Sequence, residues 1–263
     1  MKLIITAPNG KMGRIITQAA AERTNIEIVG AVGPKGRPYI GKDVADVTQL
    51  SQPLGVPVTD SIASVIGKAD AVIDFSTVEE SMEVLAACRQ AGTALACGTT
   101  GFSPEQRQQF RDAAQDAPVM LAANTSRMVN VMYRLLEIAA KSLDGADIEL
   151  IEMHDNTKLD APSGTAGEMG RILAEARGQD PESTAVYGRQ GICPREPGTI
   201  GYHSIRGGDL ISHHTVSFFG TGEWLEIAHH SDNFRCFAEG AIDCAEFLST
   251  KENGWFTAKD AFA

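Results

Sequence analysis

The sequence predicts an α/β protein made of a doubly wound parallel sheet and a second, inserted α+β domain built on an open mixed sheet. Strands and helices alternate over residues 1–125, whereas three strand-like segments follow one another without helices over 199–231. A last helix, at about 233–250, could pack back on the first domain. We therefore expect residues 1–125 and about 233–263 to form one domain, and 126–232 to form the other.

The first domain's strands are short apolar runs, and its helices repeat apolar residues at helical spacing. Gly92 is a typical helix end, and Ser103 followed by Pro104 is a typical helix start. The expected strands are 2–6, 27–32, 69–76, 93–101 and 118–124, with helices after the turn at 8–10 and at 78–92 and 103–115. Such a sheet binds its ligand at the carboxyl ends of the strands.

The second domain combines two helices with a mixed sheet. We expect helices at 129–143 and from Ser163 to about Arg177, strands at 147–154, 199–206, 210–219 and 223–231, and a surface loop at 178–197, which is rich in Pro, Gly and charge.

The charge excludes some classes of partner. The chain has 23 Lys and Arg against 34 Asp and Glu, a formal net charge of −11. This balance argues against nucleic acid or an anionic membrane as a general partner, but not against an anionic small molecule. No apolar run approaches the ~20 residues of a membrane span, and the N-terminus lacks the features of a signal peptide. Five scattered Cys indicate free thiols, so we expect a cytoplasmic protein.

A Gly-containing turn, APNGKMG at 7–13, follows the first strand and precedes a helix. Backbone N–H groups of such a turn can approach a pyrophosphate, and its position at the start of an alternating α/β chain favours a Rossmann-like, nucleotide-binding domain. Ala7 replaces the first Gly of the usual fingerprint, so a plain strand–helix turn is the alternative. The residues expected to contact the cofactor here are Ala7, Pro8, Asn9, Gly10, Lys11 and Met12.

The second strand is followed by GPKGR at 33–37, with no carboxylate for a ribose hydroxyl. Lys35 and Arg37 could meet a 2′-phosphate, which favours NADPH over NADH. The alternative is a solvated loop with incidental charges. Two further strand ends, GTTG at 98–101 and AANT at 122–125, could bring backbone close to a ligand, although such turns are common.

The segment HDNTKLDAPSGTA at 154–166 joins a strand to a helix. His154 suits proton transfer near neutral pH, and Lys158 is a nearby cation. Ser163 can cap the helix, while Gly164 and Thr165 add exposed N–H groups, so this start could bind a carboxylate. The alternative is that these residues only cap a helix and meet solvent.

The histidine pairs 213–214 and 229–230 lie on expected strands. Neighbouring strand residues point to opposite faces, so neither pair can chelate a metal jointly. No third ligand stands at a familiar spacing, and we expect no metal site.

Together these motifs resemble the dihydrodipicolinate reductase family, nearly end to end. The resemblance rests on GKMGR at 10–14, DFS at 74–76, CGTTGF at 97–102, IEMH followed by KLDAPSGTA at 151–166, and SIRGGDLISHHTVSF at 204–218. It implies a nucleotide-binding domain, an inserted substrate domain with a mixed sheet, a homotetramer, and reduction of 4-hydroxy-tetrahydrodipicolinate, a small anionic cyclic dicarboxylate, by NADPH or NADH in lysine and diaminopimelate biosynthesis.

The resemblance also implies residue roles. His154 would be the general acid/base, Lys158 the proton donor, and Gly164 and Thr165 the holders of a substrate carboxylate. The turn at 7–12 would cradle the pyrophosphate. The nicotinamide side would be lined by Gly98, Thr99, Thr100, Ala122, Ala123, Asn124 and Thr125.

Three positions depart from the family pattern. Asp155 stands where the family has a second His expected to touch substrate, and its carboxylate would repel a dianion unless it points away. Thr125-Ser126-Arg127 replaces the usual loop, and the Arg127 cation could partly compensate. Ala7 replaces Gly. Two alternatives follow: a paralogous reductase of another cyclic imine or enamine, or a nucleotide-binding sensor without catalysis.

Overall fold

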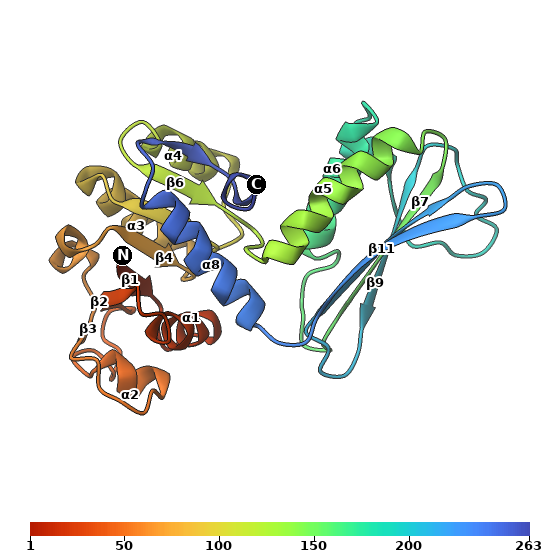
Figure 1. The fold of residues 1–263 in the computed structure, drawn as a ribbon. Helices are drawn as coiled ribbons and strands as arrows, with labels where there is room; N and C mark the ends of the chain where they lie inside the picture. The colour runs from red at the N-terminus through yellow and green to blue at the C-terminus, as the bar shows by residue number, and fades with distance from the viewer. The chain divides into compact units, whose positions relative to one another are not determined.

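The chain divides into two compact units, and the computed structural model describes residues 1–263 (Figure 1). The first unit contains Met1–Arg127 and Phe234–Ala263, and the second contains Met128–Asn233. Each unit has its own sheet and hydrophobic core. No helix combines the length and the apolar character needed to cross a lipid bilayer.

The first unit is built on a seven-stranded sheet in which every neighbouring pair of strands is parallel. The strands, in spatial order, are β12 (Gly254–Phe256), β6 (Pro118–Leu121), β5 (Ala94–Cys97), β4 (Ala71–Asp74), β1 (Lys2–Thr6), β2 (Glu27–Val32) and β3 (Val58–Thr59). The order reverses between β4 and β1, and ligands of doubly wound sheets bind beside such a switch point.

Helices cover both faces of this sheet, as the doubly wound prediction requires. The helices are α1 (Lys11–Ala21), α2 (Val44–Thr48), η1 (Ile62–Ser64), η2 (Ile66–Lys68), α3 (Val78–Ala91), α4 (Pro104–Ala113), α8 (Arg235–Leu248) and α9 (Ala258–Ala261). Leu3 and Ile5 pack with α1 and α8 on one face, and Ile4, Val72 and Leu95 pack with α3 and α4 on the other.

The helix ends predicted from the sequence are confirmed. The hydroxyl of Ser103 accepts the backbone N–H of Gln106, and Pro104 occupies the first turn of α4. Gly92 ends α3 in the left-handed conformation, at φ 67°, which Gly adopts without steric cost. Local sequence therefore determines where these helices begin and end.

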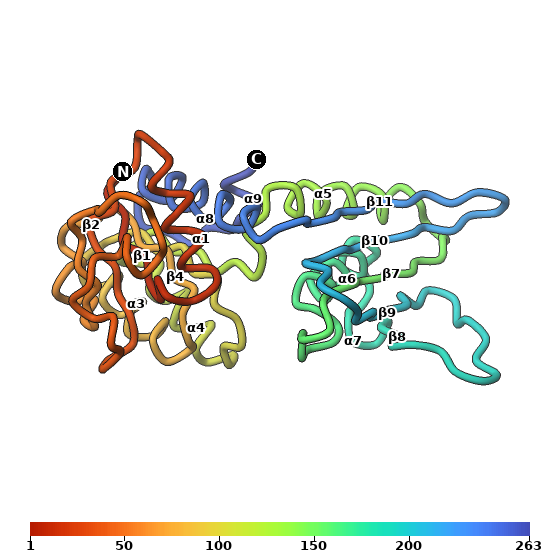
Figure 2. The backbone as a smooth tube through the Cα atoms, turned by 90° about the horizontal axis from the view of Figure 1, so that it is seen from below, coloured from red at the N-terminus to blue at the C-terminus, as the bar shows by residue number.

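The second unit is built on a five-stranded mixed sheet, and Figure 2 shows its strands side by side. Their order is β11 (Trp224–Ser231), β10 (Ser212–Phe219), β7 (Asp147–His154), β9 (Ile200–Arg206) and β8 (Ala185–Tyr187). β10 is antiparallel to β7 and β11, whereas β9 is parallel to β7 and β8. The core of the unit lies between this sheet and the helices α5 (Arg127–Ser142) and α6 (Gly164–Ala176).

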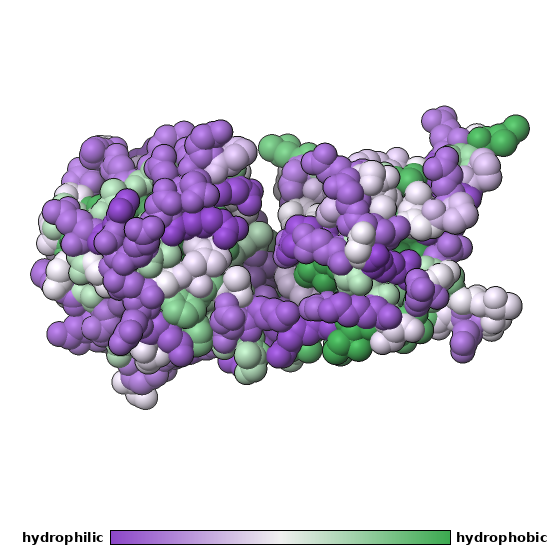
Figure 3. Space-filling view, turned by 90° about the horizontal axis from the view of Figure 1, so that it is seen from above, coloured by the Kyte–Doolittle hydropathy of each residue, from purple (hydrophilic) through white to green (hydrophobic).

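Hydrophilic side chains cover most of the molecular face shown in Figure 3. The second unit nevertheless exposes several large apolar side chains, which include Leu135, Ile138, Tyr187, Ile205, Phe219, Trp224 and Leu225.

The prediction of a plain surface loop at 178–197 is wrong in part. Pro181–Thr184 forms the short helix α7, and β8 pairs in parallel with β9. The sequence also gave no sign of β12, which follows α8 and pairs with β6. Both strands have only three residues, too few to show a hydrophobic period, so distant pairing partners create them.

Candidate active site

A buried carboxylate joins three strand ends in the first unit. Asp74, the last residue of β4, is fully buried and accepts hydrogen bonds from the hydroxyls of Thr6 at 2.6 Å, Ser76 at 2.6 Å, Ser81 at 2.5 Å and Thr99 at 3.3 Å. These donors lie on β1, after β4, on α3 and after β5. Asp74 therefore holds the loops at the carboxyl edge of the sheet in fixed positions.

In the turn after β1, the backbone of Ala7 lies close to the backbone at the start of α1. Ala7 has a φ of 47°, in the left-handed region, and its carbonyl accepts the N–H of Gly10 at 2.9 Å. A Cβ at Gly13 would lie 2.1 Å from that carbonyl oxygen. Gly13 thus permits the close approach, while Ala7 adopts a conformation that favours Gly.

Two pockets border this turn. The first, of about 300 Å³, is lined by Gly10, Lys11, Met12, Phe75, Ser76, Thr77, Val78, Gly98, Thr99 and Thr100. A Cβ at Gly98 would lie 2.1 Å from the Phe75 ring, so the absence of a side chain there lets the ring lie against the strand end. Pro8 and Asn9 complete the turn without lining this pocket, and Asn9 accepts a hydrogen bond from Arg14.

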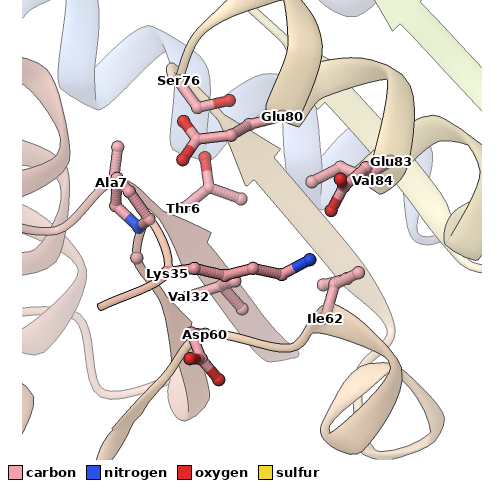
Figure 4. A pocket seen from close by; sticks show the side chains of 12 residues that line it. Thr6, Ala7, Val32, Lys35, Asp60, Ile62, Ser76, Glu80, Glu83 and Val84 are labelled. Atoms are coloured by element: carbon pink, nitrogen blue, oxygen red, sulfur yellow. The ribbon is translucent and has the colours of Figure 1, made fainter. Parts of the chain in front are cut away.

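The second pocket is smaller, about 140 Å³, and is shown in Figure 4. It is lined by Thr6, Ala7, Val32, Gly33, Pro34, Lys35, Asp60, Ile62, Ser76, Glu80, Glu83 and Val84. The Lys35 side chain extends across it. Ser76 lines both pockets, so they adjoin.

Three carboxylates share the second pocket with Lys35, and the sequence analysis missed them. Asp60 follows β3, and Glu80 and Glu83 lie in the first turns of α3. Residues that follow a strand or begin a helix in this fold lie at the ligand-binding edge of the sheet, so their positions in the sequence could have placed them near a ligand. Arg37, proposed beside Lys35, is not among the lining residues.

The residues at 122–125 line neither pocket, although the N–H of Ala122 donates to the carbonyl of Cys97, the residue before Gly98, at 2.9 Å. Thr125 donates its hydroxyl to the carbonyl of Phe237 at 2.6 Å, and a Cβ at Gly240 would lie 1.7 Å from the Thr125 carbonyl oxygen. This loop is therefore packed against α8. Arg127 pairs with Asp243 of α8 at 3.1 Å, within the first unit.

In the second unit, one face of β7 changes from apolar to polar along the strand. Ile148 and Leu150 belong to the core, and Glu152 and His154 follow on the same face, both buried. On β10, His214 stands directly opposite Glu152. The sheet thus ends in a buried polar layer beside the start of α6.

Glu152 is the centre of this layer. Arg206 donates two hydrogen bonds to its carboxylate, at 2.7 and 2.9 Å, and the N–H of Ser163 donates a third at 3.3 Å. Nδ1 of His154 lies 2.5 Å from Oε2. Burial raises the pKa of Glu152, but hydrogen bonds from Arg206, Ser204 and His154 outweigh burial and lower it to about 2.

The two buried histidines are neutral near pH 7. Burial lowers the pKa of His154, and the opposing effect of Glu152 does not restore it. Burial and the neighbouring His154 lower the pKa of His214 to about 3. The rings lie edge to face with centroids 5.3 Å apart, and His214 Nε2 is 3.0 Å from the Ser163 hydroxyl.

Ser163 caps α6 as predicted: its hydroxyl accepts the N–H of Ala166 at 3.1 Å. No acidic residue lies in the first turn of α6, and a Cβ at Gly164 would meet no atom within 4 Å. Gly164 and Thr165 therefore begin a helix with open space beside Gly164, at an end that attracts anions.

The loop between β7 and α6 positions Lys158 and Asp155 differently. Lys158 Nζ lies 2.6 Å from Asp160, whose backbone carbonyl accepts a hydrogen bond from Arg206. Asp155 accepts hydrogen bonds from the N–H of Thr157, at 2.8 Å, and from the Thr157 hydroxyl. Lys158 is thus linked to His154 only indirectly, through Asp160, Arg206 and Glu152, whereas Asp155 accepts hydrogen bonds from its own loop.

Sequence reasoning missed Glu152, Arg206 and His214. Glu152 and His154 are two residues apart on a strand, a spacing that places them on one face, and this signal was available. Nothing local connected Arg206 or His214 to them. Nearby, His213 stands opposite His230, with ring centroids 4.7 Å apart, and His214 opposite His229.

Comparisons with known proteins show the family to which the chain belongs. Family models described as dihydrodipicolinate reductase, N-terminus and C-terminus, match residues 1–125 and 128–262. The 4-hydroxy-tetrahydrodipicolinate reductases of Nitrosomonas europaea and Burkholderia ambifaria are each 41% identical over 262 residues, which cover 99% of this chain and 97% and 98% of theirs. The chain belongs to the dihydrodipicolinate reductase family.

A solved structure extends the likeness to the fold. The dipicolinate-bound dihydrodipicolinate reductase of Paenisporosarcina sp. TG-14 has a TM-score of 0.77 and 26% identity, and the match covers 98% of this chain and 97% of that one. An amine dehydrogenase from Mycobacterium smegmatis, 14% identical with a TM-score of 0.64, shares the fold alone. The reductase is thus an oxidoreductase with an N-terminal, Rossmann-like domain that binds a pyridine nucleotide.

Proposed function

We propose that this reductase converts 4-hydroxy-tetrahydrodipicolinate to tetrahydrodipicolinate with NADPH or NADH, in lysine and diaminopimelate biosynthesis. The observation that carries the proposal is the full-length similarity to enzymes of that name. The cluster in the second unit supports it, because one network, Lys158–Asp160–Arg206–Glu152–His154, includes both proton-transfer residues and lies beside a helix start suited to a carboxylate.

The first unit offers residues that fit a dinucleotide. The turn Ala7–Met12 would cradle the pyrophosphate, chiefly through the N–H groups of Asn9, Lys11 and Met12, because Pro8 has none and Ala7 and Gly10 donate theirs within the protein. The two adjoining pockets would hold the groups on either side of it. Gly98, Thr99 and Thr100 would line the nicotinamide side, as would Ala122, Ala123, Asn124 and Thr125. Lys35 would meet a 2′-phosphate. The three carboxylates around Lys35 oppose that contact, so both NADPH and NADH remain in the proposal, with NADPH the first to test.

The reaction replaces a hydroxyl group by hydrogen, so water leaves and one proton is taken up. The bound cofactor would supply the hydride. Ser163, the cap of α6, would border the substrate, and Gly164 and Thr165 would hold a substrate carboxylate through their N–H groups and the helix dipole, since the N–H of Ser163 already binds Glu152. Lys158 would donate the balancing proton, and His154 would exchange a proton with the substrate as the general acid/base.

The two rival functions have less support. A paralogous reductase would use Asp155 for a cation or hydroxyl, but the Asp155 carboxylate accepts hydrogen bonds from Thr157. A sensor without catalysis would have no chemical reason to keep His154 and Lys158 in one set of contacts.

The direct test mixes the purified protein with NADPH and freshly generated 4-hydroxy-tetrahydrodipicolinate and follows the absorbance of the reduced nicotinamide. Oxidation that depends on the substrate is the expected result. Binding of NADPH without oxidation would reject the proposed substrate and favour a rival. The same assay with NADH gives the cofactor preference.

We also propose that the protein is a cytoplasmic homotetramer. None of the five cysteines forms a disulfide, which supports a reducing compartment. The apolar side chains exposed on the second unit, among them Tyr187, Trp224 and Leu225, support burial against other copies. Light scattering coupled to size-exclusion chromatography measures the assembly directly.

A further inference from the structure

Glu152 has no role in the mechanism so far, yet it makes the closest polar contact of His154. Its Oε2 lies 2.5 Å from Nδ1, and both side chains lie on the buried face of β7. An ionised carboxylate only accepts hydrogen bonds, so Nδ1 must carry the proton. In the neutral imidazole the lone pair is then on Nε2.

Hydrogen bonds from other groups keep the Glu152 carboxylate ionised and fix its position. The guanidinium of Arg206 binds both carboxylate oxygens, and the N–H of Ser163 binds Oε1. Glu152 is fully buried, so solvent does not compete for these contacts. Paired and hydrogen-bonded in this way, the carboxylate stays charged through the neutral pH range, consistent with its lowered pKa.

We propose that Glu152 is a positioning residue for the reduction, which holds the His154 ring with its proton on Nδ1 and makes Nε2 the nitrogen that exchanges a proton with substrate. This inference rests on the proposed function. Glu152 also accepts the N–H of Ser163. One carboxylate therefore positions both the His154 ring and the start of α6, which is proposed to hold the substrate.

A purely structural role for Glu152 is the competing explanation. The ion pair with Arg206 joins β7 to β9, and its loss alone could disturb the fold. The tests must therefore separate an effect through His154 from a loss of structure.

The first test needs no variant of Glu152 and no turnover. In the wild-type protein with ¹⁵N-labelled histidine side chains, His154 is assigned by the signal lost in His154→Gln. At neutral pH we expect a protonated Nδ1 and an unprotonated Nε2. The opposite tautomer would overturn the proposal, even if Glu152→Gln failed to fold.

The second test is a double-mutant cycle. Glu152→Gln should lower kcat by about 10²-fold, as expected when a catalytic imidazole loses its orienting carboxylate, with cofactor affinity retained. In a His154→Gln background the same change should cost less than about threefold, because the lost interaction acts through His154. Equal losses in both backgrounds would refute the positioning role.

Glu149→Gln is the matched control. Glu149 is also a β7 carboxylate paired with arginines, Arg189 and Arg195, but it lies three residues from Glu152 and does not contact His154. Its kcat should stay near the wild-type value. If wild-type protein shows no turnover, the proposed function fails, while the histidine spectrum still decides the tautomer.

Discussion

Ala7→Gly should stabilise the first unit, although it deletes a methyl group. Ala7 has a φ of 47°, and the left-handed conformation costs an L-residue with a Cβ roughly 1–2 kcal/mol. Glycine avoids this cost but loses roughly 0.5–1 kcal/mol more backbone entropy on folding. The difference predicts a gain of about 0.5–1 kcal/mol in the free energy of unfolding.

Thermal unfolding of the cofactor-free protein measures this gain. For a domain of this size, 1 kcal/mol raises Tm by about 2–4 °C, so we expect an increase of roughly 1–4 °C. Gln49→Gly is the matched control, because Gln49 is exposed, has a φ of 63° and lies outside both pockets. Both variants should be stabilised.

The affinity for NADPH should distinguish Ala7, which lies in the cofactor turn, from Gln49, which does not. Ala7→Val places a β-branched side chain in a left-handed turn beside Gly10, so it should lower both Tm and NADPH affinity. A Tm of Ala7→Gly equal to or below that of wild type, with Gln49→Gly stabilised, would refute the assigned strain at the turn.

Three further predictions concern the site. Lys158→Ala should reduce kcat by about 10²-fold, the usual contribution of a general acid, while NADPH still binds; unchanged turnover would remove Lys158 from the mechanism. Lys35→Ala should weaken NADPH binding by about tenfold, the affinity that one hydrogen bond to a charged group contributes, and should weaken NADH binding less. Arg37→Ala, outside the pocket, is the control. Equal losses of affinity for both cofactors would reject the contact between Lys35 and the 2′-phosphate. His214 binds its proton far less readily in the folded state, with a pKa of about 3 against an ordinary 6.5, so it makes stability fall as pH drops below 6.5 towards 3. His214→Asn should flatten that fall between pH 6.5 and 4.5, measured as Tm, and a slope unchanged from wild type would contradict the burial of a neutral ring.

The core helices and strands of the first unit could be predicted because their signals are local. A buried parallel strand is a continuous apolar run, as in Ala71–Ile73, and helix starts such as Ser103-Pro104 are set by hydrogen bonds within four residues. The turn at Ala7–Met12 and the cap at Ser163 were found in the same way. The three-residue strands β8 and β12 carry no such period and exist through their partners β9 and β6.

The sequence by itself determined the family, the alternating first domain and the loop that carries His154 and Lys158. Only the tertiary structure decided which side chains surround them. Arg206 comes from β9 and His214 from β10, each more than fifty residues along the chain from Glu152, and strand register brings them to one buried layer. The same holds for Asp60, Glu80 and Glu83 around Lys35. A buried charge requires partners, but any distant residue of suitable chemistry can be that partner, so the pairing is settled only when the sheet forms.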